Sequence, residues 1–102
     1  MTSLDDAPVP RDGLVVHELA GEAVVFEPGS GDLHRLNPPA TTVWKLLAPD
    51  VPLRRVAADI AEVTGTDVDR VEADVLATVE RLGRSGLLLS SSGAAPEGSM
   101  QA

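Results

Sequence analysis

The stretch His34-Arg35-Leu36-Asn37-Pro38-Pro39-Ala40-Thr41-Thr42-Val43-Trp44 joins the end of a predicted strand to the start of a predicted helix. An Asn side chain before a helix can accept a hydrogen bond from a free backbone N–H, and a proline at the first helical position costs no bond. Asn37 and Pro38 therefore mark the helix start. An apolar stripe at helical spacing follows, made by Ala40, Val43, Trp44 and Leu47. We expect Trp44, the only tryptophan, to be substantially buried.

Three short strands are predicted before this junction. Residues 14–19 and 22–27 are rich in valine and flank the tight-turn pair Ala20-Gly21. The turn sequence Pro28-Gly29-Ser30-Gly31-Asp32 separates them from the third strand, Leu33–Leu36. Two successive hairpins predict an antiparallel meander. Its third strand is an edge, on which one row of backbone groups has no partner.

Alternation along these strands assigns their side chains to two faces. We expect Val24 and Phe26 to share one face with His34 and Leu36 as cross-strand neighbours. The other face is expected to carry Val25, Leu33 and Arg35.

Three helices are predicted after the strands, over residues 38–47, 53–64 and 68–85. Pro52 stands where a serine or threonine would cap the second helix better, whereas Asp67 is a good cap for the third. Gly65 and Gly86 mark the ends of the second and third helices. Strands followed by helices indicate an α+β fold, here winged-helix-like, with a three-stranded antiparallel sheet followed by three helices.

Composition limits the chain to one domain. Of the 102 residues, 13–89 form the predicted domain, while 1–12 and 90–102 have the polar, Pro-, Ser- and Gly-containing composition of unstructured tails. The net charge is −8, and residues 13–89 alone hold 7 basic and 12 acidic residues. No cysteine, membrane-length apolar run or signal peptide is present, which fits a cytoplasmic protein without disulfides.

Residue patterns typical of enzymes and metal sites are missing. The two histidines, His17 and His34, lie on predicted strands without the spacing of a metal site. Gly29-Ser30-Gly31 is a hairpin turn, not a phosphate loop, because no helix follows it directly. We therefore predict no catalytic residue, no metal, no cofactor and no enzymatic activity.

The second and third predicted helices also resemble a helix-turn-helix, which would favour DNA binding. The third helix, however, carries three arginines against four acidic residues. A recognition helix with net negative charge is poorly suited to a polyanion, so nucleic acid is not the expected partner.

The order of these elements resembles the PqqD-like peptide chaperones, also called recognition elements of ribosomally made, modified peptides (RiPPs). The matching residues are His34–Ala40, Val43-Trp44, Leu46-Leu47, Val56–Ile60, Gly65, Val71–Val75 and Gly86–Leu88. The chain departs from the pattern at Pro52 and at Thr64, where an aromatic residue is expected.

The resemblance implies a binding module that holds the leader of a precursor peptide and presents it to a modifying enzyme, often a radical-SAM protein. An exposed edge strand can accept an extended peptide as a further strand, and a groove beside the third helix would receive its side chains. The candidate peptide-binding residues are Leu33, His34, Arg35, Leu36, Val71, Asp74, Val75 and Thr78. Val71 and Val75 fit ordinary core equally well, and Arg35 equally fits a charge that protects the strand edge.

Two other classes of function stay open at this point. One is a winged-helix DNA-binding regulator, and the other is a structural or dimerisation domain without a peptide ligand. For the peptide-binding class, a monomer or weak homodimer without membrane contact is expected.

Overall fold

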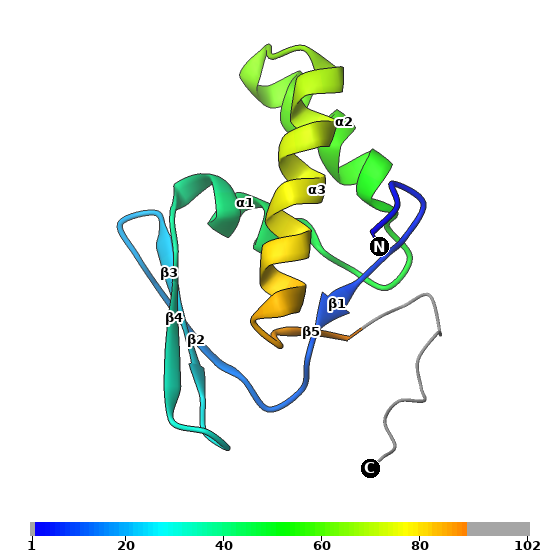
Figure 1. Cartoon of the computed structure of the whole chain (residues 1–102). Coiled ribbons are helices and arrows are strands. Elements are labelled where there is room, and N and C mark those ends of the chain that lie inside the picture. Colours follow the sequence, from blue (N-terminus) through cyan, green and yellow to red (C-terminus); the bar gives the residue numbers. More distant parts are fainter. Residues whose placement is uncertain (1, 90–102) are drawn as a thin grey trace.

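The computed structural model describes residues 2–89, which form three helices, a three-stranded sheet and a two-stranded ladder (Figure 1). The elements are β1 (Val9–Pro10), β2 (Val15–Leu19), β3 (Glu22–Glu27), β4 (Asp32–Leu36), α1 (Pro38–Leu46), α2 (Leu53–Thr64), α3 (Val68–Arg84) and β5 (Leu88–Leu89). The predicted α+β fold, an antiparallel sheet in the order β2-β3-β4 followed by three helices, is confirmed. The predicted tail 90–102 lies outside the described residues.

The assignment of side chains to the two sheet faces was wrong. Glu27 pairs with Asp32 and Val25 with His34, so the inner face carries Val25 beside His34 and Ala23 beside Leu36. Val25 is fully buried. The connecting loop is four residues long, Pro28 to Gly31, and Asp32 already belongs to β4. A loop one residue shorter than expected moves every side chain of the partner strand to the other face.

Helix α1 lies between the sheet and the α2–α3 pair and packs against both (Figure 1). Its side chains Val43 and Leu47 enter a cluster shared with α2 and α3, while Ala40 and Trp44 enter a second cluster beneath the sheet. Asn37 caps the helix as predicted, with its Oδ1 accepting from the Ala40 N–H at 2.9 Å. The predicted stripe is therefore buried, but in two clusters.

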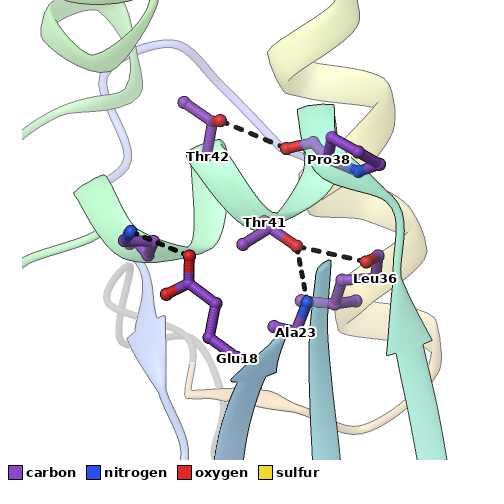
Figure 2. A network of polar contacts seen from close by, with 7 residues as sticks. Glu18, Ala23, Leu36, Pro38, Thr41 and Thr42 are labelled. Carbon is purple, nitrogen blue, oxygen red and sulfur yellow. Dashed lines mark hydrogen bonds and ion pairs between the residues drawn. The ribbon is translucent and has the colours of Figure 1, made fainter. Parts of the chain in front are cut away.

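A buried hydroxyl joins the sheet to α1 at the point where the strands separate (Figure 2). The Thr41 Oγ1 accepts from the Ala23 N–H of β3 at 2.9 Å and donates to the Leu36 carbonyl of β4 at 3.1 Å. Ala23 and Leu36 are cross-strand partners, so the hydroxyl takes the place of a direct bond between them.

The segment 1–12 was expected to be unstructured. From residue 2 onward it instead lies beside the start of α2 and pairs with β5 (Figure 1). β1 pairs antiparallel with β5, and Pro8 is buried. The carbonyls of Asp6 and Leu4 accept from the N–H groups of Leu53 and Arg54, both at 2.9 Å. A helix start leaves backbone donors free, and Pro52 offers no side-chain cap, so the segment supplies the missing acceptors.

The ends of α3 also differ in part from the sequence expectation. The Asp67 side chain makes no capping bond, contrary to the prediction, and only its backbone carbonyl accepts from the first turn, from Arg70 and Val71. At the other end Gly86 adopts a left-handed conformation (φ 78°), and the Leu87 N–H donates to the Leu82 carbonyl. This is a Schellman ending, and it turns Leu87 into the cluster beneath the sheet.

Within residues 2–89, no helix has the length and apolar character needed to cross a membrane.

Candidate functional site

The free edge of β4 is the first feature of the candidate site. Within the described residues β4 pairs only with β3. The Thr41 bridge shows that the backbone of Ala23 and Leu36 points along the β3–β4 interface. Because this direction alternates along a strand, the N–H and C=O groups of Leu33 and Arg35 point away from β3. Both sets of groups are therefore available to a further strand.

A hollow of about 370 Å³ lies beside this edge, between β4 and the C-terminal part of α3. We refer to it as the strand-side hollow. Its walls come from β3–β4, the start of α1, and the end of α3. The lining residues are Glu22, His34, Arg35, Leu36, Asn37, Ala40, Arg81, Leu82, Ser85 and Leu87.

A second hollow of about 370 Å³ lies farther along α3, where the start of α1 faces the end of α2. We refer to it as the helix-side hollow. Apart from Asp74, its lining is uncharged and largely apolar. The residues are Pro38, Pro39, Thr42, Val43, Ile60, Thr64, Thr66, Val71, Asp74, Val75 and Thr78.

One side of α3 connects the two hollows. Residues of α3 at helical spacing line first one hollow and then the other, from Val71 and Val75 through Thr78 to Leu82 and then Ser85 just beyond it. The fourteen-residue separation of Val71 and Ser85 corresponds to about 21 Å at 1.5 Å per residue. An extended peptide covers that length with about six residues. The turn from β4 into α1 forms the opposite wall, since Asn37 lines one hollow and Pro38 the other.

The predicted binding residues divide between these hollows. His34, Arg35 and Leu36 line the strand-side hollow, and all four predicted helix residues, Val71, Asp74, Val75 and Thr78, line the helix-side hollow. Val71 and Val75 also belong to the helical core cluster, so their assignment to the core is confirmed, while their contact with a peptide stays a prediction. Leu33 lines neither hollow and is 67% exposed. Its expected contribution is the backbone N–H and C=O at the free edge of β4.

The second half of the α3 wall was not among the predicted site residues. Arg81, Leu82 and Ser85 continue the stripe of Val71, Val75 and Thr78 at three- and four-residue intervals, so helical periodicity alone could have indicated them.

A charged cluster sits at the far end of the β3–β4 hairpin. Glu27 is ion-paired with Arg11, and its second carboxylate oxygen lies 3.5 Å from the Nε2 of His34. The Arg11 hydrogen bond is the main reason why the pKa of Glu27 is lowered. The cluster thereby fastens the segment before β2 to the sheet.

The same hairpin places ligand atoms of Glu27, Asp32 and His34 within 4.8 Å of one another. This grouping was not expected from the sequence, which left His34 unclustered. Because the Arg11 guanidinium already neutralises Glu27, a metal ion there would have to sit beside a fixed positive charge.

Comparison with known families places most of the chain in one of them. The family described as coenzyme PQQ synthesis protein D (PqqD) matches residues 22–88, from the start of β3 to the start of β5. A comparison with curated proteins gives no match.

Two solved structures share the fold. One is TbiB1 in complex with the TbiA(beta) leader peptide, which is 22% identical, with a TM-score of 0.69 over 86% of this chain and 99% of that one. The other is the solution NMR structure of the PqqD truncation of Methylobacterium extorquens PqqCD, described as a functional, stand-alone RiPP recognition element. It is 21% identical, with a TM-score of 0.75 over 87% of this chain and 95% of that one.

Proposed function

Because the chain belongs to the PqqD family, we propose that it binds the leader segment of a ribosomally synthesised precursor peptide. The leader adds as a strand beside β4 and lays its side chains into the two hollows along α3. A structure of similar fold, TbiB1, is in complex with a leader peptide, which supports this class of ligand.

The observation that carries the proposal is the free edge of β4 beside a groove walled by α3. Backbone hydrogen bonds to Leu33 and Arg35 would hold any extended peptide, because they depend little on its sequence. The side-chain hollows would then select among peptides. The edge of β2 is the alternative acceptor in the same sheet, but no β2 residue lines the strand-side or the helix-side hollow.

The proposed role is that of a peptide chaperone without catalysis of its own. The bound leader would hold the rest of the precursor near a modifying enzyme, which raises the effective concentration of substrate. A radical-SAM protein or another maturase is the proposed enzyme. Nucleic acid is not a proposed partner, since the net charge is −8.

Amide chemical-shift mapping tests the proposal. The probes are synthetic peptides that cover the leader of any short precursor found encoded beside this gene, titrated into the full chain. We expect shifts in two groups, at residues 32–39 and 71–85, with dissociation constants of about micromolar to nanomolar. Shifts confined to the β2 edge would contradict the proposed site, and no shift at saturating peptide would contradict leader binding.

A further inference from the structure

Two arginines line the strand-side hollow, and both residues are exposed. Arg81 comes from the wall formed by α3. Arg35 pairs with Val24 and alternates with the inward-facing His34 and Leu36, so it lines the hollow from the edge of β4. Within residues 2–89 neither guanidinium lies within 4.0 Å of a carboxylate. Arg11, Lys45 and Arg54 are each ion-paired, whereas Arg55, Arg70 and Arg84, which lie outside the hollow, also have no carboxylate within 4.0 Å among the described residues. Both arginines of the hollow are therefore free for a ligand.

The charge balance of the hollow is opposite to that of the chain. Glu22 is the acidic residue among the lining residues, against the two arginines, whereas the whole chain has 16 acidic and 8 basic residues. A guanidinium binds a carboxylate through charge-assisted and often bidentate hydrogen bonds. The helix-side hollow differs, since its one charged lining residue is the acidic Asp74.

We propose that the strand-side hollow is a specificity subsite that takes an acidic side chain, aspartate or glutamate, of the bound peptide. Arg81 is the principal partner of its carboxylate, and Arg35 supports it from the strand edge. This inference rests on the proposed leader binding and adds to it the chemistry of one peptide position.

The geometry also sets where that acidic residue stands in the peptide. The side chains of Leu82 and Val75, which line the two hollows, are seven residues apart on α3, or about 10.5 Å. An extended chain crosses that distance in about three residues. The acidic residue should therefore lie about three positions from an apolar residue that fills the helix-side hollow.

Selection from a displayed library of random nine-residue peptides, with the full chain as bait, tests this inference. We expect enriched peptides to carry Asp or Glu at one position and an apolar residue about three positions away. In the best-binding peptide, the acidic residue is then replaced by its amide, Asn or Gln. This replacement should weaken binding to the wild-type protein about tenfold, but binding to the Arg81→Gln variant less than twofold. Arg81→Glu should shift the preference at that position to Lys or Arg.

Arg70→Gln is the matched control, because Arg70 is an exposed arginine of α3 that lines neither hollow. It should keep the acidic preference, and thermal melts should show that all variants remain folded. Enrichment without an acidic position, or an acidic preference that survives both Arg81→Gln and Arg35→Gln, would overturn the subsite while leaving leader binding intact. A selection that enriches no peptide would overturn leader binding itself, and the subsite with it.

Discussion

The hydroxyl of Thr41 lies 2.9 Å from the backbone nitrogen of Ala23, eighteen residues earlier, and accepts its hydrogen bond. Thr41 is 3% exposed and is the polar residue among the buried side chains of residues 2–89. Its second bond, to Leu36, holds the end of β4 where the chain turns into α1. The junction between β4 and α1 is thus held by a side chain that belongs neither to the apolar stripe nor to the helix cap. It also fixes which backbone groups of β4 face the free edge.

Replacing Thr41 by valine should destabilise the fold by about 1–3 kcal/mol, because a buried N–H and a buried carbonyl would each lose a partner while the volume is preserved. Chemical denaturation measures the free energy of unfolding. Thr42→Val is the control, since Thr42 is exposed and bonds only within its own helix, to Pro38 at 3.1 Å. Equal effects of the two substitutions would contradict a special role for the bridge.

Trp44→Ala should cost about 3–5 kcal/mol, the usual range for truncating a large buried side chain. Trp44 is 7% exposed and packs in the cluster beneath the sheet. A small domain has little stability in reserve, so the variant should be largely unfolded by circular dichroism. A near-normal melting temperature would contradict the packing described for α1.

Removing residues 1–8 should lower the melting temperature, because the Leu53 and Arg54 N–H groups at the start of α2 would lose the carbonyls of Asp6 and Leu4. A cap supplied at Pro52 should compensate. Pro52→Ser is expected to add about 0.5–2 kcal/mol in the shortened chain and less in the full chain. Equal effects in both chains would mean that the segment does not cap α2.

The ion pair of Glu27 predicts an acid-dependent loss of stability. Since its pKa is lowered from 4.5 on folding, mainly by the Arg11 hydrogen bond, its contribution is complete above that value and is lost as the pH falls through the folded pKa. Glu27→Gln should therefore be less stable than wild type at pH 7, and the two should converge in strong acid. Glu18→Gln, which removes the exposed pair with Lys45, should change stability little at any pH.

The fold class and the element order could be predicted from the sequence, because helical stripes and turn residues are local signals. The faces of the sheet could not. Gly31, with a φ of 81°, closes a four-residue loop in which its N–H donates to the Glu27 carbonyl, so that Asp32 joins the strand. The sequence Pro28 to Asp32 fits a four- or a five-residue loop, and the two differ by one residue of register.

The ordered N-terminal segment was missed for another reason. Its residues are polar and proline-containing, and their value lies in backbone carbonyls that reach α2. Backbone acceptors have no compositional signature. The candidate site divides in the same way. Val71, Asp74, Val75 and Thr78 could be proposed from their places on the third helix, whereas only the tertiary structure brings Arg35 and Arg81 to one hollow.

Leu33 offers a direct test of strand addition. Its side chain lines neither hollow, while its N–H is inferred to face the free edge. Leu33→Pro removes that donor, whereas Leu33→Ala also removes the leucine side chain but keeps the backbone N–H. For the best peptide, Leu33→Pro should weaken binding roughly 2- to 10-fold, the value of one ordinary hydrogen bond, whereas Leu33→Ala should bind as wild type does.

Calorimetric titration of both variants measures the difference, and thermal melts establish that both are folded. An outward N–H takes no part in the β3–β4 ladder, so proline is tolerable at this edge position. Equal affinity of the two variants would mean that no peptide strand bonds to Leu33. The binding would then depend on the hollows along α3 alone, and substitutions at Arg81 and Val75 should account for it.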